Sequence, residues 1–130
     1  MEKYLIKFIE WTKLKIRIHF STRIIYFRER EVWWASLGIN IGFEQDGKNK
    51  NFTRPILVFK KFNQDLLWAL PLTSKLRNNK YYFQIEYNQR KYSVILSQLK
   101  LISSKRLIRK IRKISVVDYY NIKTAIKKLI

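Results

Sequence analysis

The stretch Glu31-Val-Trp-Trp-Ala-Ser-Leu-Gly-Ile-Asn-Ile-Gly-Phe-Glu-Gln-Asp-Gly47, followed by Arg54-Pro55-Ile-Leu-Val58, decides the fold. A strand-like segment, Val32 to Leu37, leads into a loop, and a second apolar strand begins at the Arg-Pro pair. All three glycines of the chain lie in this stretch. Their clustering indicates a loop of specific shape, although a plain hairpin turn would also account for it. The pattern brings a carboxylate, Glu44, and a guanidinium, Arg54, to the ends of neighbouring strands.

Further short apolar segments, separated by polar turns, are predicted to be strands. They are enriched in β-branched and aromatic residues, and their spacing is typical of a small curled antiparallel sheet or barrel. The predicted strands are Ile24 to Leu37 with a break at Arg28 to Glu31, then Ile56 to Phe59, Leu66 to Leu72, Lys80 to Tyr87, Tyr92 to Leu96 and Leu99 to Ile102, with a turn at 88–91.

An amphipathic helix is predicted at the start of the chain, from residue 2 to about residue 17. Leu5, Ile9 and Ile16 fall on one helical stripe, although residues 14–20 alternate strictly, as a strand would. We expect residues 1–29 to be an N-terminal helical extension of a domain formed by residues 30–130.

The pattern becomes helical again after Ser103. Ser104 is predicted to cap a short helix that runs through Ile108, and Ser115, with Asp118 three residues later, to cap a second one. The predicted fold class is therefore α+β, with helices at both ends of a strand-rich domain.

The formal net charge of +19 is the most informative feature of the composition. It is strongest in residues 99–130, where Asp118 is the only acid. Such a charge attracts polyanions, of which nucleic acid is the commonest in a cell. An acidic protein or an anionic membrane would also be attracted. The charge could also serve only to keep the protein soluble, without any partner. The N-terminal segment carries Glu2 and Glu10, which disfavour a membrane surface, so no membrane partner is expected.

The start of the chain lacks the apolar core of a signal peptide, and the longest uncharged run, Leu66 to Ser74, is too short to span a bilayer. The chain has no cysteine, which fits a cytoplasmic protein, the expected localisation.

The residue inventory narrows the possible chemistry. One histidine, His19, and no cysteine make Ser-His-Asp, Cys-His and His-ligated metal sites improbable, and no phosphate-binding glycine motif is present. Arg, Lys, Glu, Thr and Ser remain. That set suits one reaction on RNA, because RNA carries its own nucleophile, the 2′-OH, and the protein need only position and stabilise the reacting phosphate. No cofactor is expected.

One ordered set of motifs runs through the chain from about residue 30. It comprises Trp33-Trp34, Leu37-Gly38, Gly42-Phe-Glu44-Gln45, Arg54-Pro55-Ile-Leu-Val58, Leu70-Pro71-Leu-Thr73-Ser74, Ser93 to Ile102, Lys105-Arg-Leu107 and Lys110-Ile111. This order resembles the MazF/PemK family of toxin endoribonucleases. The resemblance implies an SH3-like barrel with a C-terminal helix and a homodimer. It also implies metal-independent cleavage of single-stranded RNA at short sequences, an acidic antitoxin partner, and DNA binding together with that antitoxin.

Carried over by position, the resemblance implies three catalytic residues. Arg54 would hold the scissile phosphate and could give a proton to the leaving 5′-oxygen, Thr73 would hydrogen-bond a phosphate oxygen, and Glu44 would orient Arg54 or assist the 2′-OH. The implied RNA-contacting residues are Gln45, Ser74, Lys75 and Trp34, with no metal ligands. The residues alone favour structural roles instead, a surface salt bridge from Arg54 to Glu44 and a turn at Thr73.

The chain also departs from the family pattern. Arg30-Glu31 stands where the family usually has Gly-Asp, Phe43 replaces the serine of the usual Gly-Ser-Glu-Gln, and the segment from Gln45 to Arg54 is longer than usual. A non-catalytic SH3-like module that binds DNA or RNA therefore remains the alternative hypothesis.

Overall fold

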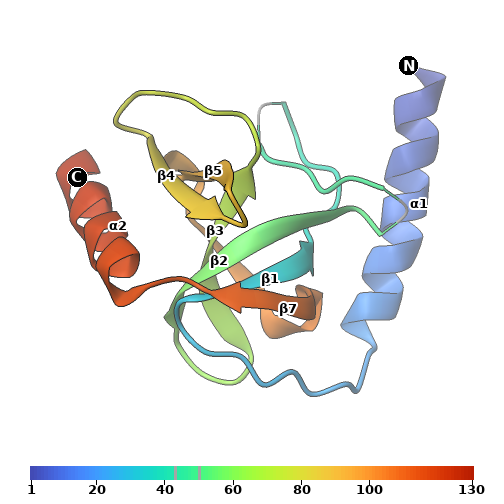
Figure 1. The fold of residues 1–130 in the computed structure, drawn as a ribbon. Helices are drawn as coiled ribbons and strands as arrows, with labels where there is room; N and C mark the ends of the chain where they lie inside the picture. The colour runs from blue at the N-terminus through green and yellow to red at the C-terminus, as the bar shows by residue number, and fades with distance from the viewer. Residues whose placement is uncertain (43, 50) are drawn as a thin grey trace.

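The computed structural model describes residues 1–42, 44–49 and 51–130. Phe43, one of the departures noted above, lies outside them. A long helix is followed by a strand-rich body and a second helix (Figure 1). The elements are α1 (Glu2–His19), β1 (Glu31–Ser36), β2 (Thr53–Lys61), β3 (Leu66–Thr73), β4 (Tyr82–Tyr87), β5 (Arg90–Ile95), η1 (Leu96–Gln98), β6 (Lys100–Ser103), η2 (Ser104–Arg106), β7 (Leu107–Lys113) and α2 (Val116–Leu129).

The strands of the described residues form one curled antiparallel sheet in the order β4-β5-β3-β2-β1-β7, with β6 paired to β3. The predicted α+β class, with a helix at each end, is confirmed. The central pairing places Arg54 opposite Ala35 and Trp34 opposite Pro55, so the motif that opened the sequence analysis forms two adjacent strands.

Alternation along the central strands divides the core between the two faces of the sheet. On β2, Ile56 and Val58 pack in one apolar cluster and Leu57 packs in the other. Ile25 and Phe27 complete the first cluster, whereas α2 completes the second with Tyr119 and Ile122. The curled sheet therefore has a packed interior on both sides, which fixes the strand ends that carry the polar motifs.

Two of the predicted elements differ in the structure. Residues 24–27 alternate between exposed and buried but are assigned to no strand, and β1 begins only at Glu31. The helix predicted from Ser104 through Ile108 is wrong, because a single 3-10 turn ends at Arg106 and β7 follows. β7 pairs with β1 at the edge of the sheet, a tertiary contact that local pattern does not reveal.

The helix predictions at the two ends hold. α1 extends to His19, two residues beyond the expected end. Ser115 caps α2 as predicted, since its hydroxyl accepts a hydrogen bond of 3.0 Å from the amide of Asp118. No helix in the described part of the chain is long and apolar enough to cross a membrane.

Arg30 and Glu31, which depart from the family pattern, are both used structurally. Arg30 has a φ of 75°, a left-handed conformation that favours glycine, and its guanidinium donates to the carbonyl of Ile114 at 3.0 and 3.2 Å. The buried carboxylate of Glu31 accepts hydrogen bonds from the Arg28 amide at 2.7 Å and the Trp33 indole at 3.1 Å. These contacts compensate for an unfavourable backbone and a buried charge at the start of β1.

Candidate functional site

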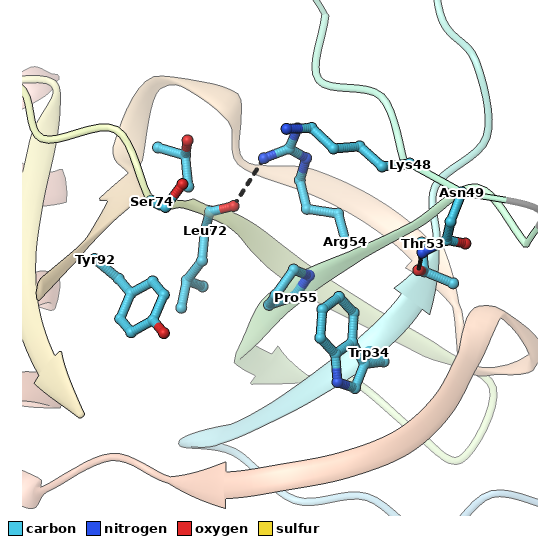
Figure 2. A pocket seen from close by; sticks show the side chains of 10 residues that line it. Trp34, Lys48, Asn49, Thr53, Arg54, Pro55, Leu72, Ser74 and Tyr92 are labelled. Carbon is cyan, nitrogen blue, oxygen red and sulfur yellow. Dashed lines mark hydrogen bonds between the residues drawn. The ribbon is translucent and has the colours of Figure 1, made fainter. Parts of the chain in front are cut away.

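Arg54 lies near the start of β2, with its side chain fixed by two backbone carbonyls. Its Nε donates to the carbonyl of Asp46 at 2.7 Å. Its Nη1 donates to the carbonyl of Leu72 at 3.0 Å (Figure 2). Both acceptors are neutral, so they orient the guanidinium without cancelling its charge. Five N–H groups are available on a guanidinium, and these two bonds leave most of them for a ligand.

Burial lowers the pKa of Arg54, and the nearby Asp46 carboxylate acts in the opposite direction. Because the ordinary pKa of arginine lies far above neutral, the side chain stays protonated at physiological pH. Partial burial therefore strengthens the interaction of a permanent cation with an incoming anion.

A pocket of about 310 Å³ opens at this guanidinium (Figure 2). Its walls come from the end of β3, the start of β2, β1, β5 and the loop before β2, and they are formed by Trp34, Lys48, Asn49, Thr53, Arg54, Pro55, Leu72, Thr73, Ser74 and Tyr92. The pocket combines two cations, Lys48 and Arg54, with hydroxyl groups. This is the donor set that a phosphate group requires.

The end of β3 supplies two of the hydroxyl groups. The Thr73 Oγ1 accepts a hydrogen bond of 3.2 Å from the amide of Lys75, which stabilises the turn that follows the strand. This bond leaves the hydroxyl hydrogen of Thr73 free to donate. Ser74 is exposed and lines the same pocket.

A second, apolar cavity of about 180 Å³ continues the pocket along the sheet, because the two share Trp34, Pro55, Leu72 and Tyr92. We call the combined feature the strand groove. Its far wall includes Tyr87 and Arg112, whose guanidinium carbon lies 4.5 Å from the Tyr87 ring centroid. The strand groove thus combines aromatic side chains with cations at both ends, and this combination suits a ligand with both flat rings and negative charge.

The structure brings four of the sequence-predicted residues together: Arg54, Thr73, Ser74 and Trp34 all line the pocket. Lys75 is exposed and does not line it. The other two predicted residues lie in the loop between β1 and β2 and do not line it either.

The Glu44 carboxylate accepts a hydrogen bond of 2.9 Å from the amide of Ile41 and lines a separate pocket with Gln98 and Lys100. Gln45 is held through its backbone, since its amide donates to Gln98 Oε1 at 2.8 Å and its carbonyl accepts from Asn40 Nδ2 at 2.7 Å. The predicted roles of Glu44 and Gln45 stay predictions.

Sequence reasoning missed Lys48, Asn49, Thr53 and Tyr92. Lys48 and Thr53 exchange backbone hydrogen bonds of 2.7 and 2.8 Å, which folds the polar loop back beside Arg54. Asn49, with a φ of 66°, donates from Nδ2 to Thr53 Oγ1 at 2.9 Å. The signal in the sequence is a run of Lys and Asn at residues 48–51, with two residues between it and Arg54; by pattern alone this run is a polar loop.

Across residues 1–42, 44–49 and 51–130, no three His, Cys, Asp or Glu side chains converge as metal ligands would. The polar groups that line the pocket at Arg54 include cations, hydroxyls and the amide of Asn49.

Residues 28–130 match the model of the PemK-like, MazF-like toxin of type II toxin–antitoxin systems. No curated protein matches the chain.

Three solved structures share the fold. A MazF from Deinococcus radiodurans is 16% identical, with a TM-score of 0.63 and coverage of 81% of this chain and 97% of that one. The Mycobacterium tuberculosis toxin MazF-mt6 is 16% identical, with a TM-score of 0.59 and coverage of 76% and 94%. A mycobacterial endoribonuclease, solved in complex with its cognate antitoxin, is 13% identical, with a TM-score of 0.60 and coverage of 79% and 93%.

Proposed function

Because this chain belongs to the PemK-like, MazF-like toxin family of type II toxin–antitoxin systems, we propose that it is an endoribonuclease that cleaves single-stranded RNA at short sequences without a metal ion. The single observation that carries the proposal is the pocket at the strand ends. There Arg54, held by two carbonyls, faces the same space as Lys48 and the hydroxyls of Thr73 and Ser74. The aromatic walls of the strand groove favour an unpaired strand, since bases stacked in a duplex do not expose their faces.

In the proposed reaction, the 2′-hydroxyl loses its proton to solvent as its oxygen attacks the adjacent phosphorus, and the 5′-oxygen leaves and takes up a proton from solvent. The products are a 2′,3′-cyclic phosphate and a 5′-hydroxyl. The guanidinium of Arg54 stabilises the extra negative charge on the phosphoryl oxygens of the transition state, and Thr73 donates a hydrogen bond to one of them. Lys48 adds a second positive charge from the loop side of the pocket.

The charged state of Arg54 favours transition-state stabilisation over proton donation as its main role. Although burial lowers its pKa, arginine does not release its proton in proteins. We therefore assign the 2′-OH activation to no residue of the pocket, and we keep Glu44 as a candidate that would have to leave the Ile41 amide.

The test is cleavage of a long single-stranded RNA in EDTA by the parent protein, Arg54→Ala and Arg109→Ala. Arg109 is an exposed arginine on β7 outside the pocket, so it controls for loss of one charge. Arg54→Ala is expected to lower the rate by about 10² to 10³, the scale for removing one preorganised donor, while the control stays within about threefold. Parent fragments should end in 2′,3′-cyclic phosphate. Near-parental cleavage by Arg54→Ala would remove this residue from the mechanism.

The net charge of +19 supports a second candidate, a module that binds DNA or RNA without cleaving it. The same experiment separates the two, because a binding module leaves the RNA intact but retarded in a native gel. In either case the affinity should fall steeply with salt, since phosphate contacts release counterions.

The proposed partners follow from the family and the charge. An antitoxin with an acidic segment complements a chain of net charge +19, and we propose that it inhibits the enzyme by occupying the cationic surface. The same proposal includes three further properties: the chain forms a homodimer, it binds DNA together with the antitoxin, and it acts in the cytoplasm. Size-exclusion chromatography with light scattering tests the dimer, since a mass near 16.0 kDa would contradict it.

A further inference from the structure

A second pocket, of about 420 Å³, lies between α1 and the loop that joins β1 to β2. We call it the helix-side pocket. One wall comes from α1 and the other from the loop, and the lining residues are Tyr4, Lys7, Glu10, Ile39, Asp46, Gly47, Lys48, Asn49 and Phe52. The family match begins at residue 28, so the α1 wall lies outside the matched region.

The helix-side pocket and the pocket at Arg54 share one wall, because Lys48 and Asn49 line both. The same short segment contains Asp46, whose carbonyl orients the Arg54 guanidinium. A hydrogen bond of 2.7 Å from the Gly47 amide to the carbonyl of Gly38 holds this segment to the residues that follow β1. A flexible polymer that crosses Lys48 and Asn49 can therefore place successive units in the two pockets.

The position of α1 beside this segment is fixed by Trp11, the buried residue of the helix. Its indole packs on Phe52 with ring centroids 5.6 Å apart, and the Arg106 guanidinium lies 5.7 Å from its centroid. Any Cβ on Gly38 would overlap the indole, so the loop carries a glycine where the helix docks. Lys105 adds a hydrogen bond of 2.7 Å from its Nζ to the carbonyl of His19. Both walls of the helix-side pocket are therefore anchored. Figure 1 shows α1 beside the loop that joins β1 to β2.

The chemistry of these walls matches a nucleotide of an unpaired strand. Tyr4, with 66% of its surface exposed, offers an aromatic face for a base, and Lys7 and Lys48 offer cations for the flanking phosphates. Two carboxylates also line the pocket. Asp46 is occupied in accepting a hydrogen bond of 2.6 Å from the Asn40 amide. Glu10 repels a phosphate, but it can accept a hydrogen bond from the amino group of a base.

We propose that α1 and residues 46–49 form a binding position for one nucleotide of single-stranded RNA, adjacent to the nucleotide whose phosphate contacts Arg54. This inference rests on the proposed function, which places RNA in the pocket at Arg54. It assigns the N-terminal extension a role in holding the substrate: Tyr4 stacks on the base, Lys7 and Lys48 neutralise phosphate, and Glu10 favours bases that carry an amino group.

The experiment measures binding of a fluorescein-labelled, 2′-O-methylated single-stranded RNA of mixed sequence, whose blocked 2′ positions prevent cleavage. Fluorescence anisotropy gives Kd for the full-length parent, Tyr4→Ala and Lys7→Ala. The matched controls are Tyr120→Ala, an exposed tyrosine on α2, and Lys13→Ala, an exposed lysine on α1 outside the pocket.

Tyr4→Ala is expected to raise Kd about tenfold, in the range for losing one stacked base, and Tyr120→Ala less than about twofold. Lys7→Ala should also reduce the slope of log K against log salt by about 0.7, which is the value for one phosphate contact on a single strand. The control Lys13→Ala should reduce this slope less. A merely structural role of Lys7 would leave that salt dependence unchanged. Circular dichroism should show the same helical content in all five proteins.

Equal Kd values and equal salt slopes for the pocket variants and their controls would overturn the inference and leave the pocket to a protein partner. A parent that does not bind the RNA would overturn it too. Failure of the proposed function gives a different result. If the parent binds RNA but does not cleave an unmodified strand, only the ribonuclease proposal is contradicted. The binding comparison then still decides whether α1 holds a nucleotide.

Discussion

The two helices at the ends of the chain differ in how much of each is buried against the rest of the protein and in how each begins. On α2, Tyr119 and Ile122 are buried in the apolar cluster that fills one side of the sheet, and Ser115 caps the first turn. On α1, Trp11 is the buried residue, and the N-terminal turn has no side-chain cap. Figure 1 shows α2 lying against the strands and α1 standing at the far edge, with its N-terminus projecting away.

This difference separates structural from functional roles. A helix that contributes several buried residues to a core unfolds with that core, whereas an isolated helix of 18 residues with one anchor is only marginally stable by itself. Large apolar side chains on α1, such as Leu5, Ile6 and Ile9, remain exposed. We therefore expect α2 to be inseparable from the fold and α1 to open independently of it.

Ile122→Ala tests the first half of the comparison and should have the largest effect. Ile122 is fully buried, and its truncation leaves a cavity between α2 and the sheet. The free energy of unfolding is expected to fall by about 2 to 5 kcal/mol, measured by urea denaturation. Loss of α2 protection in hydrogen exchange without loss of strand protection would contradict the claim that the two unfold together.

Trp11→Ala tests the second half. Hydrogen exchange should show that the amides of α1 lose their protection, while those of β2 and β3 keep theirs, because the anchor of the helix lies outside both apolar clusters of the sheet. The global free energy of unfolding should fall by less than in Ile122→Ala.

Gly38→Ala gives an independent route to the same state, since the added Cβ meets the indole and the φ of 78° disfavours alanine. If either variant melts the strands along with α1, the helix is part of the cooperative core and the comparison fails.

The limits of sequence reasoning are clearest at β7. Ile108 and Ile111 are three residues apart, which favours a helix, and a helix was predicted through Ile108. In the structure, the pairing of β7 with β1 shifts register between Lys110 and Arg112 and again between Leu107 and Arg109. Ile108 and Ile111 each lie at one of these shifts. Their spacing of three residues therefore reflects two irregularities in an edge strand and not the turn of a helix.

Near Arg54 the sequence was more informative, because residues at the ends of paired strands are placed by the register. The resemblance to the MazF/PemK family implied one site containing Trp34, Arg54 and Thr73, and the ladders β1–β2 and β2–β3 bring these residues to one pocket. Loop positions were not predictable in this way. Glu44 and Lys48 take their places from backbone hydrogen bonds within the loop, and those depend on its exact path.

Tyr119→Phe sharpens the comparison by removing one hydrogen bond between α2 and the sheet. The phenol donates a hydrogen bond of 2.7 Å to the carbonyl of Phe59, and the substitution removes this bond. We expect a loss of about 1 to 2 kcal/mol in the free energy of unfolding near neutral pH.

The same variant predicts a change in pH dependence. Burial, followed by the nearby Glu29, raises the pKa of Tyr119, so the fold favours the neutral phenol. Above a pH of about 10, Tyr119 ionises in the unfolded chain before it ionises in the folded protein. The stability that the neutral phenol contributes is therefore lost as the pH rises further. Tyr119→Phe should therefore flatten the alkaline decline seen in the parent. An identical decline in both proteins would assign it to other groups.

Ser115→Ala is expected to have the smallest effect, and it asks whether capping contributes to the contrast between the helices. The Ser115 hydroxyl satisfies the Asp118 amide at the exposed first turn of α2, and removing such a cap costs about 1 kcal/mol. Since the buried residues of α2 remain in place, the helix should stay docked, with faster exchange confined to its first turn. If the cap variant released the whole of α2, local capping rather than burial would distinguish the two helices, and the single tryptophan of α1 would no longer explain its independence.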